Sequence, residues 1–389
     1  MSHSQAFMSL DARGPMQLED TRVDAPRLAE FSKNTQFPIS TGGQCGTGGG
    51  YAAHTAISNI PLAQAGPLSK QTSKFDWSST NAVIAFGDSY TYVQGTQGRQ
   101  NFSFIGDQFD FAYDTETLLS NKIVQNQTGT AEGGPNWIEY LTDCGVKDGL
   151  TSPKSCEKQL WDFAFAGADI STEYIPLHHN YTLSLENQIT QFTQYGHPAL
   201  QKNKQTTNPK ETLVAIWIGI NDISDSAKYP VPSFQEFYKT LTKSLFASVE
   251  SLYDLGYRKY LFMNLPPLDR TPGNQADINP SPNATQVAWY NQALETQADA
   301  FGAGHGDVEV RVFDAHSRLA AMLDGPARYG IVNTTGFCVG YDQPDIEVEY
   351  LKYGCPVPLE EYFWFNSGHL TSHVHRVLAE ELEGWLKSK

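Results

Sequence analysis

The chain has 389 residues, of which 40% are hydrophobic, enough to bury a large core. Its formal net charge is −16, from 43 acidic and 27 basic side chains, and this acidic balance disfavours nucleic acid and anionic lipid surfaces as partners. No run of about 18 apolar residues occurs, which excludes an ordinary membrane-spanning helix. We therefore expect a soluble globular protein that binds neither nucleic acid nor a membrane.

The sequence carries marks of the secretory pathway. Its first ten residues lack a basic start followed by an apolar stretch, so no signal peptide is visible in this chain. Asn-X-Ser/Thr sequons, which are used only in the secretory pathway, occur at Asn101, Asn126, Asn180, Asn283 and Asn333. We therefore predict a secreted glycoprotein.

The cysteines point to the same compartment. Cys144 with Cys156, and Cys338 with Cys355, form two pairs in loop-like stretches that contain Gly or Pro, and Cys45 is left over. The spacings match no CxxC or Cys/His zinc site. We predict two disulfides and an oxidising compartment.

Residues 1–75 are polar, unpatterned and rich in glycine, and we interpret them as an N-terminal extension. From there on, short apolar runs alternate with longer amphipathic stretches, which is typical of βαβ units. Residues 76–389 are therefore predicted to form one α/β domain with a parallel sheet. Its predicted strands are residues 82–86, 161–165, 213–218, 257–265 and 308–313, and its clearest predicted helices are 233–255, 283–301 and 371–385.

Ligands of open α/β sheets bind beyond the carboxyl ends of the strands, so the residues that follow each strand are the candidates for a functional site. Ser89 comes directly after the first predicted strand, and Gly87 permits a tight turn that leaves the serine hydroxyl at the edge of the sheet. A serine placed there can be a nucleophile or the N-cap of a helix. The Gly-X-Ser-X-Gly motif of α/β-hydrolases is absent.

A serine hydroxyl needs a neighbouring imidazole to accept its proton. Among the ten histidines, His369 is favoured because it follows an aromatic run and precedes the last predicted helix. His373 and His375 fall within the first turns of that helix and are interpreted as surface or packing residues. Loop-like contexts without a motif hold His178, His179, His197 and His305.

Acyl transfer also needs donors aimed at the developing oxyanion. Gly167 follows the second predicted strand and can present its backbone N–H without a side chain in the way. Asn221 follows the third strand and offers a side-chain amide. Glycine and asparagine are also common turn residues, so neither alone indicates an oxyanion hole. Their joint placement at the ends of predicted strands does.

These residues resemble, in order and rough spacing, the four conserved blocks of the GDSL or SGNH hydrolases over about residues 75–389. The resemblance implies a three-layer α/β/α sandwich similar to flavodoxin, with Ser89 as nucleophile and His369 as base. It also implies an oxyanion hole made of the Ser89 N–H, the Gly167 N–H and the Asn221 side chain. Further stretches look like the fungal acetyl esterases of carbohydrate esterase family 16: residues 133–137, 213–222 and 264–267.

One position departs from the family pattern. Asn366 stands three residues before His369, where members usually carry an aspartate that orients the imidazole and stabilises its charge. Three alternatives follow: a Ser-His dyad whose ring is held by Asn366 or a backbone carbonyl, an acid from elsewhere such as Asp342 or Asp345, or a weakened or lost activity.

The function predicted from this resemblance is the removal of acetyl groups from sugars, with short xylo- or manno-oligosaccharides as substrates and no cofactor or metal. Two rivals remain open: a lipase or general short-chain carboxylesterase using the same site, and a non-catalytic carbohydrate-binding relative. Aromatic side chains that could offer a face to a sugar, although core packing is the favoured interpretation, are Tyr90, Trp137, Trp217 and Trp364.

Overall fold

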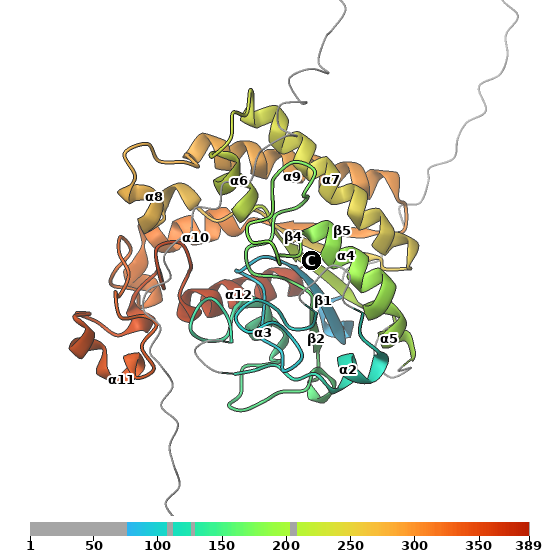
Figure 1. The fold of residues 1–389 in the computed structure, drawn as a ribbon, viewed down its shortest axis with the longest axis horizontal. Helices are drawn as coiled ribbons and strands as arrows, with labels where there is room; N and C mark the ends of the chain where they lie inside the picture. The colour runs from blue at the N-terminus through green and yellow to red at the C-terminus, as the bar shows by residue number, and fades with distance from the viewer. Residues whose placement is uncertain (1–75, 107–111, 126–128, 203–207, 389) are drawn as a thin grey trace, which may run out of the picture.

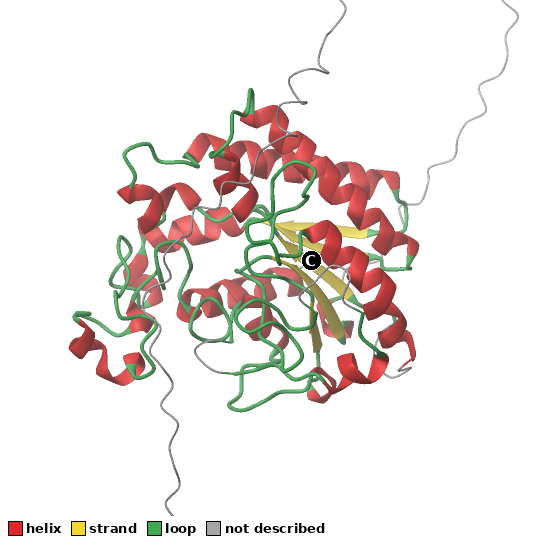
Figure 2. Cartoon of the chain, viewed as in Figure 1, coloured by secondary structure: helices red, strands yellow, loops and turns green. Residues whose placement is uncertain are grey.

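The computed structural model describes residues 76–106, 112–125, 129–202 and 208–388. Its centre is a five-stranded sheet in which every neighbouring pair is parallel, in the order β2-β1-β3-β4-β5. Helices cover both faces of this sheet (Figures 1 and 2). The strand order is that of flavodoxin-like folds, so the predicted three-layer α/β/α class is confirmed.

All five predicted strands are present, at β1 (Ala82–Gly87), β2 (Gln159–Asp162), β3 (Leu213–Trp217), β4 (Lys259–Met263) and β5 (Glu309–Phe313). The largest error concerns β2, which was predicted at 161–165 but ends at Asp162. The Asp162 carboxylate accepts a hydrogen bond from the Ala164 N–H at 2.8 Å, which bends the chain out of regular strand geometry. The segment after Asp162 still runs alongside β1, because the Phe165 N–H donates to the Gly87 carbonyl at 3.1 Å.

The three predicted helices are α7 (Phe234–Asp254), α9 (Ala284–Gly304) and α12 (Ser372–Lys387). Each was predicted to start one residue too early, because Ser233, Asn283 and Thr371 are N-caps whose side-chain oxygens accept backbone N–H groups of the first turn. The other α-helices of the described residues are α2 (Thr115–Ser120), α3 (Trp137–Thr142), α4 (Leu185–Gln191), α5 (His197–Lys202), α6 (Ile220–Ser226), α8 (Pro272–Ala276), α10 (Ala315–Asp324) and α11 (Ile346–Glu349). No helix of the described residues is both long and apolar enough to cross a membrane.

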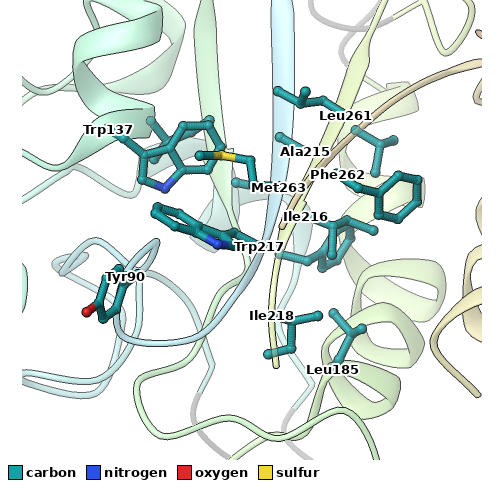
Figure 3. Packing of buried hydrophobic residues seen from close by; sticks show 14 of the residues in the cluster. Tyr90, Trp137, Leu185, Ala215, Ile216, Trp217, Ile218, Leu261, Phe262 and Met263 are labelled. Carbon is teal, nitrogen blue, oxygen red and sulfur yellow. The ribbon is translucent and has the colours of Figure 1, made fainter. Parts of the chain in front are cut away.

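The core lies between the sheet and these two helical layers. Alternate residues of the central strands point to opposite faces, so Trp217 and Met263 lie with Trp137 of α3, whereas Ile216 and Phe262 point to the other side (Figure 3). Helices α4, α7 and α9 pack together on one side, and α3 packs against α12 on the other (Figure 1). Trp137 and Trp217 meet edge to face with ring centroids 5.8 Å apart.

Both predicted disulfides are present, Cys144 with Cys156 and Cys338 with Cys355. The second closes the segment that carries α11. Together with Ile346, Leu359, Tyr362 and Phe365, its two cysteines form a small apolar cluster apart from the main core. This disulfide-linked cluster therefore reaches Phe365, which directly precedes Asn366.

The sequons differ in accessibility. The side chains of Asn101, Asn180 and Asn283 are exposed, whereas Asn333 is partly buried and its amide oxygen accepts two backbone N–H groups. Asn126, Cys45 and the predicted extension at 1–75 lie outside the described residues.

Candidate active site

Three of the sequence blocks meet at one edge of the sheet. β1 lies between β2 and β3, and all three run in the same direction, with Ala85 paired to Asp162 and Gly87 paired to Trp217. The carboxyl ends of the three strands therefore lie side by side. Ser89, Gly167 and Asn221 follow these three ends.

Ser89 lies in a turn that leaves β1 without entering a helix. The Thr91 and Tyr92 N–H groups both donate to the Asp88 carbonyl, and the Asp88 side chain accepts from the Tyr90 N–H at 3.0 Å. The N-cap alternative for Ser89 is therefore wrong. Its side chain is partly buried, and its hydroxyl is free to face another element.

That element is the loop before α12. The Ser89 Oγ lies 2.8 Å from His369 Nε2, although the two residues are 280 positions apart in the sequence. On the other side of the ring, His369 Nδ1 lies 3.0 Å from Asn366 Oδ1. The structure thus brings the predicted nucleophile, the predicted base and the residue at the usual aspartate position into one hydrogen-bonded chain.

The hydrogen bonds of Asn366 determine which ring nitrogen of His369 carries the proton. The backbone N–H groups of Gly368 and His369 donate to the same Asn366 side-chain atom at 3.0 and 2.9 Å. Only the amide oxygen can accept these bonds, so an oxygen also faces His369 Nδ1. Nδ1 must then carry the hydrogen, and Nε2 presents its lone pair to the Ser89 hydroxyl. This tautomer is the one a general base needs.

The alternative of an acid from elsewhere finds no support in the structure. Asp345 accepts hydrogen bonds from Lys352, at 2.9 Å, and from Tyr353. Asp342 accepts from the Gln343 amide at 3.0 Å. The Nδ1 of His369 meets Asn366 instead, so the pair Asp342 and Asp345 was a wrong suggestion.

Tyr90, next to the serine, also contacts the loop next to the histidine. Its hydroxyl donates to the Gly368 carbonyl, and its ring centroid lies 5.4 Å from that of His369. The loop is closed further by a hydrogen bond from the Phe365 N–H to the His369 carbonyl, 2.8 Å long. Sequence reasoning considered Tyr90 only as a sugar platform and missed this contact, because nothing local in the sequence signals it.

Gly167 and Asn221 follow β2 and β3, the two strands that lie on either side of β1. Gly167 has φ = +81°, a backbone conformation that favours glycine, and a Cβ at this position would lie 3.2 Å from Cδ2 of His178. Asn221 is the second residue of α6, and its Nδ2 donates to the Ala168 carbonyl at 3.0 Å. That bond uses one of the two amide hydrogens and orients the nitrogen end toward the 167–168 turn, leaving the second hydrogen as a donor.

Buried carboxyl groups lie behind this edge. Burial raises the pKa of Asp88 to about 7 and of Asp222 to about 8, and burial with the neighbouring carboxyl of Asp222 raises the pKa of Asp169 well above its usual range. At mildly acidic pH these groups are largely protonated, and at pH 7 Asp88 is about half ionised while Asp222 and Asp169 remain mostly protonated. At mildly acidic pH they therefore add little negative charge beside the position where an oxyanion would develop.

Burial also lowers the pKa of His369, to about 4, which keeps the ring neutral at neutral pH. The helical histidines are packing residues, as interpreted. His375 is fully buried, and its Nδ1 accepts the Trp137 N–H at 3.2 Å, while His373 Nε2 lies 2.7 Å from the Tyr329 carbonyl oxygen.

The candidate sugar platforms are core residues. Tyr90, Trp137, Trp217 and Trp364 are each at most 2% exposed, so none offers a free face. The described residues contain no group of three His, Cys, Asp or Glu side chains that could hold a metal ion. Two surface cavities in the described part of the chain are not lined by Ser89: Tyr113 and Tyr195 line one, and Val124 and Pro135 line the other.

Comparison with known proteins shows which family this chain resembles. The model of the GDSL-like lipase/acylhydrolase family matches residues 83–382. An acetylesterase of Thermothelomyces thermophilus is 26% identical over 311 residues, covering 79% of this chain and 89% of that protein. An acetylesterase of Hypocrea jecorina is 23% identical over 330 residues, covering 77% and 86%.

Plant proteins and solved structures also match. A GDSL esterase/lipase of Arabidopsis thaliana is 26% identical over 318 residues, covering 73% of this chain and 83% of its own length. Among solved structures, a carbohydrate acetylesterase from Sinorhizobium meliloti aligns over 79% of this chain and 99% of its own, with 13% identity and a TM-score of 0.38.

Proposed function

Because the chain belongs to the GDSL-like lipase/acylhydrolase family and is therefore a carboxylic ester hydrolase, we propose that it removes acetyl groups from carbohydrates through a Ser89 acyl-enzyme. The observation that carries the proposal is the chain of contacts from Ser89 Oγ through His369 to Asn366 Oδ1. The two fungal relatives named acetylesterase support the choice of acetyl as the acyl group. Short xylo- or manno-oligosaccharides are the proposed carriers of that acetyl group.

In the first half of the reaction, Ser89 Oγ attacks the acetyl carbonyl carbon while His369 Nε2 accepts the hydroxyl proton. The carbonyl oxygen becomes an oxyanion, which accepts hydrogen bonds from the Ser89 N–H, the Gly167 N–H and the Asn221 amide. Each such donor contributes roughly 2.7–4 kcal/mol in enzymes where it has been removed. The bond to the sugar oxygen then breaks, and His369 returns the proton to the leaving hydroxyl.

In the second half, water attacks the acetyl-Ser89 ester while His369 accepts a proton from it. The same donors hold the second oxyanion. Collapse of this intermediate breaks the ester bond, releases acetate and restores the Ser89 hydroxyl with the proton from His369. Throughout, Asn366 Oδ1 keeps the ring in one tautomer but adds no charge to balance the imidazolium.

The test compares wild type with Ser89→Ala on p-nitrophenyl acetate, butyrate and palmitate and on acetylated xylo-oligosaccharides. We expect release of acetate from the oligosaccharides, a preference for acetate over the longer chains, and loss of all these activities in the variant. Unchanged activity of Ser89→Ala contradicts the nucleophile. Preference for palmitate makes the protein a lipase, and binding of oligosaccharides without turnover makes it a non-catalytic relative.

The proposal includes a secreted protein whose esterase domain spans residues 76–389. Two disulfides support an oxidising compartment, and exposed sequons at Asn101, Asn180 and Asn283 are accessible to glycosylation. Mass spectrometry of protein from a eukaryotic host, before and after removal of N-glycans, tests this part separately.

A further inference from the structure

A group of aromatic and imidazole rings lies beside Gly167. Its members, which we name the ring cluster, are Phe102, His178, His179 and Tyr181. His179 stacks on Tyr181 with centroids 5.1 Å apart, and Phe102 meets both rings edge to face. The cluster is joined to the oxyanion side of the site, because the Phe102 carbonyl accepts the Ala166 N–H at 2.9 Å.

Within the cluster, His178 is the member closest to Gly167. Its Cδ2 is the nearest atom to the space that a Gly167 Cβ would fill, at 3.2 Å. Nε2 is bonded to Cδ2, so this polar ring atom lies one bond from the atom that approaches Gly167, the residue whose N–H is the proposed oxyanion donor. About a third of the His178 side chain is exposed, so a ligand can reach it.

The other nitrogen of His178 is already bound. Nδ1 lies 2.9 Å from Asp225 Oδ2, and the other oxygen of that carboxylate lies 2.7 Å from Lys228 Nζ. Burial acts to raise the pKa of Asp225, but the hydrogen bonds from His178 and Lys228 outweigh it and hold that pKa below its usual range. Asp225 is therefore ionised and accepts the Nδ1 hydrogen. In the neutral ring, Nε2 is then left as a hydrogen-bond acceptor.

We propose that His178 forms a hydroxyl-binding subsite in which Nε2 accepts a hydrogen bond from the alcohol part of the ester, next to the carbon that bears the acetyl group. The inference rests on the proposed function and deepens it, since it assigns the recognition of a polyhydroxylated alcohol to a named side chain. A fixed acceptor suits a hydroxyl donor, and the ring cluster borders it with apolar faces. His178 is a positioning residue for specificity, and the acyl-transfer steps do not require it.

The test uses two acetates of three-carbon alcohols, glycerol monoacetate and propyl acetate, which differ by the hydroxyl groups. For each enzyme, kcat/KM is measured on both esters and their ratio is compared. His178→Phe keeps a ring against Gly167 but removes both nitrogens, and we expect the ratio of glycerol monoacetate to propyl acetate to fall about tenfold, the effect of one lost hydrogen bond. His178→Gln restores a polar atom near Nε2, and we expect it to recover part of the ratio.

The matched control is His305→Phe. His305 Nε2 also pairs with a carboxylate, Glu250, at 3.1 Å, but it lies after α9 and before β5, at the opposite end of the strands from Ser89. Its ratio should equal that of wild type. Melting temperatures of all variants show whether each is folded.

The outcomes separate the inference from the proposed function. Equal ratios for wild type and a folded His178→Phe, or a wild type that does not discriminate between the two esters, overturn the subsite alone. A wild type that hydrolyses neither ester overturns the proposed function and the subsite with it. Recovery of the ratio in His178→Gln, with the control unchanged, supports the subsite.

Discussion

Replacing Asn366 with aspartate tests the role of the missing charge. Asn366 Oδ1 lies 3.0 Å from His369 Nδ1, so the substitution places a carboxylate in direct contact with the ring. A neighbouring opposite charge raises a histidine pKa by about 1–3 pH units, which stabilises the imidazolium by about 1.4–4 kcal/mol. If about half of that charge has developed in the transition state, kcat rises roughly 3- to 30-fold.

The assay is the pH profile of kcat/KM on p-nitrophenyl acetate. Burial puts the pKa of His369 at about 4 in the wild type, and the acidic limb of the profile should follow this value. In Asn366→Asp the limb should move to higher pH, because a protonated ring cannot accept the serine proton.

The control for this prediction is Asn333→Asp. The Asn333 amide oxygen also accepts two backbone N–H groups, from Thr335 and Gly336 at 3.1 and 2.9 Å, but has no imidazole partner. This variant adds the same charge and should leave the limb unmoved. An acidic limb that stays in place in Asn366→Asp would refute the assignment of Asn366 as the residue that holds the catalytic ring.

Three further predictions follow from the surroundings of the site. Tyr90→Phe removes the hydroxyl that binds the Gly368 carbonyl, so kcat should fall about tenfold with little change in KM. The control, Tyr260→Phe, loses a buried hydroxyl bound to the Tyr257 carbonyl and should keep the wild-type kcat. Equal losses in both would contradict a positioning role. Replacing Cys338 and Cys355 with serine should lower the free energy of unfolding by about 2–4 kcal/mol in chemical denaturation and also reduce kcat, because their cluster supports Phe365 before the histidine loop. An unchanged kcat would show that the loop that carries His369 keeps its conformation without the disulfide. Carboxyl groups whose pKa is raised in the folded state stabilise the protein below their unfolded pKa of about 4, and this stabilisation is lost as the pH rises through their folded pKa. The folded pKa is about 7 for Asp88 and about 8 for Asp222 and Glu139. The lowered pKa of His369 and His375 acts oppositely, with stability lost as the pH falls below about 6.5, but the raised carboxyls outnumber them. The melting temperature should therefore fall between pH 5 and pH 8, and a rise over this interval would contradict the assignment. The raised carboxyls that are buried are Asp88, Glu132, Glu139, Asp162, Asp169 and Asp222.

The sequence by itself determined the class of the fold and the location of each candidate residue along it. Apolar runs such as residues 213–218 alternate with amphipathic helices, and this local pattern suffices to predict a parallel sheet because strand and helix periods differ. Ser89, Gly167 and Asn221 could be assigned to strand ends for the same reason. The two disulfides followed from the spacing and surroundings of the cysteines.

Local pattern was less reliable where side chains compete with the backbone. In the structure β2 ends at Asp162, before the predicted end at 165, because the Asp162 carboxylate binds the Ala164 N–H. Three helices begin one residue after their predicted starts, because Ser233, Asn283 and Thr371 are their N-caps. These bonds depend on rotamers that composition and periodicity do not report.

Only the tertiary structure decided what these residues can do together. The strand order β2-β1-β3 sets three strand ends side by side, and the loop before α12 brings His369 to Ser89 across 280 positions of sequence. The backbone donors around Asn366 select its oxygen as the partner of His369, and packing buries Trp137 and Trp217 while leaving His178 accessible. Such contacts arise from long-range packing, which the identity of neighbouring residues along the chain does not encode.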